Sequence, residues 1–472
     1  MTFNSLQFIL LLVLVVLTYW RLRLRGQNRL LLVASYVFYG WWDWRFLLLL
    51  LVTTVIDFAI GIRIEEAEGE RAKRSWLISQ LVFNLGILGF FKYANFFIDS
   101  AQQVATTLGL EWSAPVLRVI LPVGISFFVF HEISYAVDIF RGRLRAERNL
   151  ATYALFIAYF PLLAAGPIER AWHLLPQLRT ERRRPNREQV YSGILLIITG
   201  IFKKVVIADT VAVVANEVFA RPDGRGFIPL AVGAVAFAIQ IYGDFSGYTD
   251  VARGTSRLLG IEVFRNFEQP YLSTSITQFW RTWHISLSSW LHDYLYIPLG
   301  GNQRGRFATY RNLFLVMLIG GLWHGAAWTF VVWGGFHGAA LAVHRALGAY
   351  EPRGRPAVPG LRDVPKILGT FAFVTALWVF FRATTIGDAF EFFRNMANGP
   401  IGSAPGAWKA DLLTVGLFAA LVVAMDLVDR RRAVLRPLHW SPVVQGALVG
   451  AALVGITVWS GTAPVPFIYF QF

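Results

Sequence analysis

The sequence of 472 residues contains no cysteine. A chain without thiols forms no disulfide, offers no thiolate ligand to zinc and carries no acyl-cysteine intermediate. Charged residues are also scarce, because Asp, Glu, Lys and Arg make up only 15% of the sequence, against roughly 25% in an average soluble domain. The absence of cysteine therefore excludes acyl transfer by the cysteine route, and the low charge argues against an ordinary soluble domain.

Bulky apolar residues fill the sequence instead. Hydrophobic residues make up 56% of the chain, including 39 Phe, 17 Trp and 16 Tyr, and the mean hydropathy is +0.50. This composition excludes a disordered chain, a collagen and a coiled coil. Because the apolar runs reach the length that crosses a bilayer, the sequence predicts an all-α polytopic membrane protein.

Basic residues outnumber acidic ones, 44 to 29, which gives a formal net charge of +15. In a soluble protein this excess would indicate nucleic-acid binding. Here the arginines lie in short loops between apolar runs, as the positive-inside rule requires of cytoplasmic loops. We therefore expect the lipid bilayer as the environment of the chain, no nucleic-acid partner, and both termini on the outer side.

The apolar runs predict about eleven or twelve membrane spans with additional re-entrant helices. Segment 151–168 contains two prolines and is expected to be a re-entrant or broken helix buried in the protein. Segment 312–347 is expected to be two spans interrupted near Gly334 and Gly335. Region 248–311 is too polar to span and is expected to form interfacial or re-entrant helices. The expected spans are 6–20, 30–42, 46–62, 76–97, 117–139, 190–208, 227–247, 312–328, 330–347, 367–382, 411–427 and 443–460.

His324 is the first candidate for chemistry, in the stretch 320–328 that reads Gly-Gly-Leu-Trp-His-Gly-Ala-Ala-Trp. Glycines allow another backbone or a ligand to approach closely, and tryptophan rings form a wall that excludes water. A neutral imidazole there can take a proton from a hydroxyl group at neutral pH. The alternative is a core histidine that is hydrogen-bonded to a neighbouring carbonyl.

His284 is the second candidate, in a stretch where Arg281, Thr282 and Ser286 lie close to it. One interpretation is a functional histidine on a partly buried helix, and the alternative is an interfacial histidine without a role. His292 and Asp293, which follow, are expected to be capping or surface groups.

Asp244 and Asp250 form a third cluster, just after an apolar run. Two aspartates without a clustered histidine or a third carboxylate are a weak metal signal, so we expect no metal site. The better interpretation is a buried Asp244 that accepts hydrogen bonds from arginine or backbone donors.

These three clusters, together with Pro-Val-Gly-Ile-Ser-Phe at 122–127 and Ala-Gly-Pro-Ile-Glu-Arg at 165–170, resemble the membrane-bound O-acyltransferases. The resemblance runs over roughly residues 20–347. It is greatest to the bacterial branch that acts in alginate O-acetylation and teichoic-acid D-alanylation. It implies a single domain over 1–472 that forms a funnel, with core motifs at about 117–347 and C-terminal spans and tail at 367–472. It also implies that His324 is the invariant histidine of the family and His284 the second.

The resemblance further implies an enzyme of the bacterial inner membrane. Such an enzyme moves an acyl group, here expected to be acetyl, from a cytoplasmic thioester donor towards an extracytoplasmic polysaccharide. The donor, acetyl-CoA or an acyl carrier, is a substrate, and no tightly bound cofactor is expected. A periplasmic acyltransferase of the SGNH hydrolase type is the expected partner.

The expected donor-binding residues are Arg281, Arg304, Arg306 and Trp323. Because coenzyme A and phosphopantetheine carriers are anionic, a basic vestibule would raise their local concentration. The alternative is that these arginines serve only to set the membrane topology.

The chain ends in an aromatic tail, in which Tyr469 is the last hydroxyl. A phenol near pKa 10 is a better leaving group than a serine alcohol, so Tyr469 is a candidate carrier of the acyl group. The alternative is an interfacial aromatic belt.

Ionisable residues within membrane segments are also found in two classes of protein other than enzymes. A transporter or flippase would more often show repeated halves with paired broken helices, and the sequence shows no such repeat. A non-catalytic scaffold of a polysaccharide export machine would need neither His324 nor a water-excluding pocket.

Overall fold

A computed structural model describes residues 1–110, 112, 119–348, 358–402, 408–430, 440–460 and 467–468. The described residues form helices joined by turns and loops, with no β-strand among them. The α-helices are α1 (Leu6–Tyr19), α2 (Leu24–Gly40), α3 (Trp44–Glu66), α4 (Glu70–Leu88), α5 (Ala94–Thr107), α6 (Ile125–Phe140), α7 (Leu150–Ala158), α8 (Phe160–Leu163), α9 (Ala171–Arg179), α10 (Arg187–Phe202), α11 (Asp209–Ala220), α12 (Phe227–Leu258), α13 (Ile276–Thr282), α14 (Ile285–Leu291), α15 (Gly305–His324), α16 (Trp328–Ala346), α17 (Val364–Arg382), α18 (Ile386–Asn398), α19 (Trp408–Arg430) and α20 (Pro442–Trp459). Shorter turns of π-helix are η1 (Gly89–Tyr93), η2 (Lys203–Ala208) and η4 (His292–Tyr296), and those of 3₁₀-helix are η3 (Pro270–Leu272) and η5 (Leu361–Asp363).

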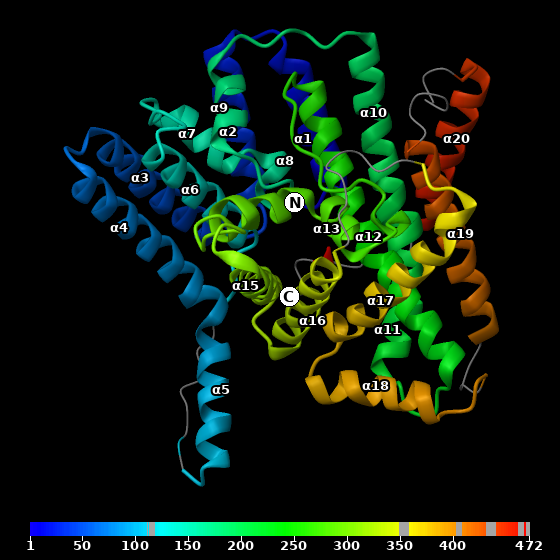
Figure 1. Cartoon of the computed structure of the whole chain (residues 1–472). Coiled ribbons are helices and arrows are strands. Elements are labelled where there is room, and N and C mark those ends of the chain that lie inside the picture. The colour runs from blue at the N-terminus through cyan, green and yellow to red at the C-terminus, as the bar shows by residue number, and fades with distance from the viewer. Residues whose placement is uncertain are drawn as a thin grey trace. The chain divides into compact units, whose positions relative to one another are not determined.

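Six helical stretches among the described residues are long and apolar enough to cross a membrane. They are Trp44–Glu66, Glu70–Thr107, Phe227–Leu258, Leu361–Arg382, Trp408–Arg430 and Pro442–Trp459. The stretch Glu70–Thr107 is a continuous helical segment of 38 residues in which η1 joins α4 to α5, and the segment bends between these two helices (Figure 1). Many of the exposed side chains on these helices are large and apolar, which suits contact with lipid rather than water. The chain is thus an all-α polytopic membrane protein, as predicted, and the number of eleven or twelve spans stays a prediction.

The described residues divide into two compact units, each built from segments that are discontinuous in sequence. Unit 1 contains Met1–Ile197 and Val251–Phe264, and unit 2 contains Ile198–Asp250 and Arg265–Phe472. The prediction of a single domain concerns the whole chain and stays a prediction.

In unit 1, α3 and α4 are joined by a buried polar contact. The Asn84 side-chain amide donates to both carboxylate oxygens of Asp57, at 2.9 and 3.0 Å, and both residues are buried. A buried carboxylate needs such donors, because an unpaired charge inside a membrane protein is costly.

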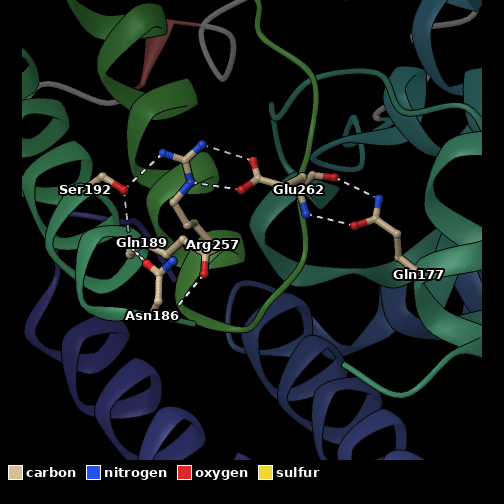
Figure 2. Close-up of polar contacts among 6 residues, drawn as sticks. All are labelled: Gln177, Asn186, Gln189, Ser192, Arg257 and Glu262. Carbon is tan, nitrogen blue, oxygen red and sulfur yellow. Dashed lines mark hydrogen bonds and ion pairs between the residues drawn. The ribbon is translucent and has the colours of Figure 1, made fainter. Parts of the chain in front are cut away.

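Hydrogen bonds also fasten the segment 251–264 to the rest of unit 1 (Figure 2). Arg257 of α12 binds both carboxylate oxygens of Glu262 and donates to the Ser192 hydroxyl of α10. The Gln177 side chain of α9 exchanges two hydrogen bonds with the Glu262 backbone, at 2.9 and 3.0 Å. The chain that leaves α12 is therefore held on two sides before it enters unit 2.

Two long helices of unit 2, α15 and α16, pack closely because glycines face each other between them. A β-carbon at Gly334 would lie 2.3 Å from the Met317 carbonyl oxygen, and one at Gly321 would lie 2.2 Å from the Phe330 carbonyl oxygen. Small residues at such positions let two helix backbones approach. The predicted interruption near Gly334 and Gly335 is wrong, because these glycines serve helix packing, and the break between the two helices lies instead at residues 325–327.

The structure also bears on two other segments for which the sequence predicts irregular helices. Segment 151–168 contains α7 and α8, separated at Tyr159, so it is a broken helix as predicted. Region 248–311 contains the short helices α13 and α14, of 7 residues each, and the turns η3 and η4. Its first part is not a separate element, because α12 continues to Leu258.

The close contact of α15 and α16 at Gly334 predicts that an added methyl group there lowers the stability of the protein. Gly334→Ala should destabilise the protein by roughly 1–3 kcal/mol, because the new β-carbon overlaps the Met317 carbonyl and forces α15 and α16 apart. The matched control is Gly416→Ala on α19, where no atom lies within 4 Å of the new β-carbon. Thermal unfolding of both variants in detergent micelles checks this, and equal unfolding midpoints would contradict it.

Candidate functional site

His324 is the last residue of α15, a helix of 20 residues, and its side chain is buried. The helix stops there because Gly325 is extended, with φ −159°. A β-carbon at Gly325 would lie 2.0 Å from an atom of the Phe330 ring, so only glycine allows that ring to pack over the helix end. The local sequence therefore fixes the position of His324 through its neighbours.

Aromatic side chains from three helices surround the His324 imidazole. Ring centroids lie 5.0 Å away for Trp323, 5.2 Å for Trp333 of α16 and 5.3 Å for Phe381 of α17. The interplanar angles of 75°, 87° and 69° are edge-to-face arrangements, which aromatic pairs favour. We call these residues, together with Phe245, the aromatic cluster.

His284 lies beside His324 in unit 2. The two imidazole centroids are 6.2 Å apart, and Trp323 lies 5.9 Å from His284. Phe245 of α12 covers the His284 ring edge-to-face at 4.7 Å. His284 is fully buried at the junction of α13 and α14, and burial lowers the pKa of its imidazole to about 3. The ring is therefore neutral at physiological pH.

The backbone of His284 adopts a rare conformation. Among the described residues, only His284 (φ 42°) and Gln269 (φ 51°) are non-glycine residues with positive φ. Left-handed backbone costs a residue with a β-carbon roughly 1–2 kcal/mol, and such strain is often found at functional sites.

The predicted donor-binding residues lie in different places. Trp323 is buried beside both histidines, with its ring centroid 5.0 Å from His324 and 5.9 Å from His284, whereas Arg281 is exposed on α13, close in sequence to His284. Arg304 and Arg306 are exposed at the N-terminal end of α15. Because a helix of this length spans about 30 Å, they lie far from His324 at its other end.

Tyr469 lies outside the described residues, but the two residues before it are described. The Ile468 N–H donates to the Asp244 carboxylate at 2.7 Å. The Phe467 ring packs on Tyr248 at 4.7 Å and on Phe245 at 6.2 Å. The tail therefore contacts Phe245, the residue that covers His284.

The remaining acidic candidates have structural partners. Asp244 is buried and accepts from the Ile468 backbone, as predicted, while its cationic partner is Lys204 at 3.0 Å rather than an arginine. His292 and Asp293 form a partly exposed pair at 2.9 Å, which confirms them as surface groups. Among the described residues, no group of three or more His, Asp and Glu side chains is arranged to hold a metal ion.

Sequence reasoning missed several residues that shape the site. Trp333 and Phe381 reach His324 from separate helices, and no local motif marks either of them. Asn266, which contacts the start of α14, is one polar residue among many in region 248–311. The only signal was the unusual polarity of that region.

Comparison with known proteins decides the family. Residues 31–380 match the membrane-bound O-acyltransferase family. The chain belongs to this family. It is therefore an O-acyltransferase, and the predicted family and enzyme class are confirmed.

Curated relatives cover most of the chain. A probable alginate O-acetylase of Pseudomonas putida is 41% identical over 95% of this chain and 95% of its own length. A second probable alginate O-acetylase, from Pseudomonas aeruginosa, is 45% identical over 79% of this chain and 70% of its own. A peptidoglycan O-acetyltransferase of Helicobacter pylori is 37% identical over 78% of this chain and 73% of its own. This membrane-bound O-acyltransferase is thus similar to bacterial O-acetylating enzymes.

The conformation of His284 predicts an order of activity among its variants. His284→Asn should retain more acyl transfer than His284→Ala, because asparagine tolerates positive φ and keeps a neutral polar group, whereas alanine provides neither. Initial rates of the two purified variants, with thermal unfolding as a folding control, check this. Equal rates for both variants, or a faster alanine variant, would show that neither property matters.

Proposed function

We propose that this enzyme transfers an acetyl group from a thioester to a hydroxyl group, with His324 as general base. The observation that carries the proposal is the pair of buried imidazoles, His324 and His284, 6.2 Å apart within the aromatic cluster. His284 stays neutral and orients the acyl carbonyl or the acceptor.

Acetyl transfer from a thioester requires few catalytic groups beyond these two imidazoles. A thioester is reactive enough without a Ser-His-Asp triad, so the enzyme must deprotonate the acceptor, hold the carbonyl and exclude water. General-base assistance of this kind contributes about 10²–10⁴-fold to the rate. The C-terminal end of a helix stabilises positive charge, and His324 gains such charge at the end of α15 when it accepts a proton.

The acceptor is proposed from the similar proteins. Alginate and peptidoglycan, named for the relatives, are glycan polymers, and we take an extracytoplasmic polysaccharide as the final acceptor of this enzyme. The enzyme then lies in the bacterial inner membrane, and a periplasmic SGNH-type acyltransferase completes the transfer. No tightly bound cofactor takes part.

The donor in this scheme is a cytoplasmic thioester, acetyl-CoA or an acyl carrier. Trp323, whose ring lies beside both histidines, contacts its reactive end in this scheme. The exposed Arg281, three residues before His284, binds another part of the donor. The exposed Arg304 and Arg306, at the far end of α15, attract its anionic part from a distance.

Tyr469 is the proposed acyl carrier between the two sides. Its phenolic oxygen forms a bond to the acyl carbon, the carbon–sulfur bond breaks, and His324 moves the phenolic proton to the leaving thiolate. Two contacts of the preceding residues support this role. Phe467 packs on Phe245, the ring that packs on His284, and the Ile468 N–H donates to Asp244.

The proposed base gives a direct test. His324→Ala should abolish thioester consumption by the purified enzyme while expression and thermal unfolding stay near those of the wild type, because the imidazole supplies the base. The control is His292→Ala, which removes an exposed histidine. Consumption by His324→Ala at the wild-type rate would contradict the assignment, and a wild-type protein that consumes no thioester would favour a transporter or scaffold.

The proposed carrier gives a second test. Tyr469→Phe keeps the ring and removes the nucleophile, so acylation of polysaccharide should stop and no acyl adduct should form on the C-terminal peptide. Mass spectrometry of that peptide, with Tyr310→Phe on α15 as the control, provides the measurement. Normal acylation by Tyr469→Phe, without an adduct in the wild type, would reduce the tail to an interfacial anchor.

A further inference from the structure

Two backbone hydrogen bonds hold the chain on either side of His284. The Glu268 N–H donates to the Thr282 carbonyl at 3.0 Å, and the Ile285 N–H donates to the Asn266 carbonyl at 2.9 Å. The loop that contains Asn266 therefore runs beside the α13–α14 junction and is hydrogen-bonded to it both before and after His284.

The left-handed backbone of His284 needs support of this kind. His284 is the N-cap of α14, with φ 42° and ψ 54°, and its side chain forms no capping hydrogen bond. A strained residue persists only when the surrounding structure holds it in place. Contacts on the residues next to His284 contribute such support.

Asn266 provides those contacts and is itself fully buried. Its side-chain oxygen accepts from the Ser286 hydroxyl at 2.6 Å, and its side-chain N–H donates to the Thr249 hydroxyl of α12 at 3.2 Å. Together with the bond from Ile285, these contacts tie the first residues of α14 to α12. We call this set of three hydrogen bonds the Asn266 link.

The same helix also covers the imidazole. Phe245 lies one turn before Thr249 on α12 and packs edge-to-face on His284 at 4.7 Å. The Asn266 link thus fixes the His284 backbone to the helix that contacts its side chain. Since His284 and His324 come from different elements, their separation depends on how firmly each backbone is held.

We propose that Asn266 is a positioning residue for acyl transfer, which holds the His284 imidazole at its working distance from His324. The inference rests on the proposed function of the two histidines. Asn266 itself contacts no reactant and acts through the backbone of Ile285 and the hydroxyl of Ser286.

Removing the two side-chain hydrogen bonds of the link should reduce the rate of the chemical step rather than the affinity for the donor. In Asn266→Ala, the Ser286 and Thr249 hydroxyls each lose their hydrogen bond to Asn266, whereas the backbone bond from Ile285 remains, so the strained backbone of His284 is held less firmly. A displacement of about 1 Å can lower a rate by about 10²-fold. We therefore expect kcat to fall by about 10- to 100-fold, while the KM for the thioester changes by less than about twofold.

Two milder variants test the link without changing Asn266. Ser286→Ala and Thr249→Val each delete one of its hydrogen bonds, and each should lower kcat by a smaller factor. If these residues act through the link, neither change should lower kcat further once Asn266→Ala is present, because coupled residues are not additive. Ser286→Ala and Thr249→Val also test the proposal by themselves if Asn266→Ala does not fold.

Asn312→Ala is the matched control. Asn312 is another fully buried asparagine of unit 2, and its side chain donates to the Leu299 and Gly301 carbonyl oxygens. This variant should lose thermal stability like Asn266→Ala while it keeps the wild-type kcat.

The experiment measures kcat, KM and the unfolding midpoint of all these variants with purified protein and acetyl-CoA. A specific loss of kcat in Asn266→Ala, with no further loss on adding Ser286→Ala or Thr249→Val, supports the proposal. Wild-type kcat in Asn266→Ala, a change in KM alone, full additivity, or an equal loss of kcat in Asn312→Ala overturns it. Failure of the proposed function looks different, because the wild type would then consume no thioester.

Discussion

The edge-on packing of the His324 imidazole against Trp323, Trp333 and Phe381 is the interaction on which the site depends. It requires α15 and α16 to lie close together, which is possible only because Gly321 and Gly334 leave no β-carbon between the two backbones. The glycines and tryptophans of this region are therefore parts of one arrangement. The glycines bring the helices together, and the aromatic rings then enclose the histidine.

The local motifs identified the two neighbouring buried histidines, but they did not predict the course of the backbone around them. His324 and His284 could be predicted because an ionisable residue within an apolar, aromatic sequence needs a partner or a purpose. The break between α15 and α16 could not, since a glycine pair suits both a helix break and close helix packing, and only the position of the partner helix decides between them. The left-handed backbone of His284 also has no local sequence signal, and the residue that hydrogen-bonds beside it, Asn266, comes from another loop.

Long-range contacts account for the remaining differences. A buried carboxylate at Asp244 was predicted from its sequence neighbours, but its partners Lys204 and the Ile468 backbone come from segments far away in sequence. The aromatic tail likewise gains significance only from the contact of Phe467 with Phe245. A single sequence shows which residues are unusual, whereas the fold determines which of them meet.

A structure of the enzyme with a thioether analogue of acetyl-CoA, which cannot transfer its acyl group, would locate the reaction site. We expect the acyl carbonyl carbon to lie between the His324 and His284 imidazoles, with the analogue's reactive end enclosed by the aromatic cluster. Binding of the reactive end elsewhere, for example in the small cleft of unit 2 lined by Lys203, Tyr242 and Asp426, would contradict this expectation.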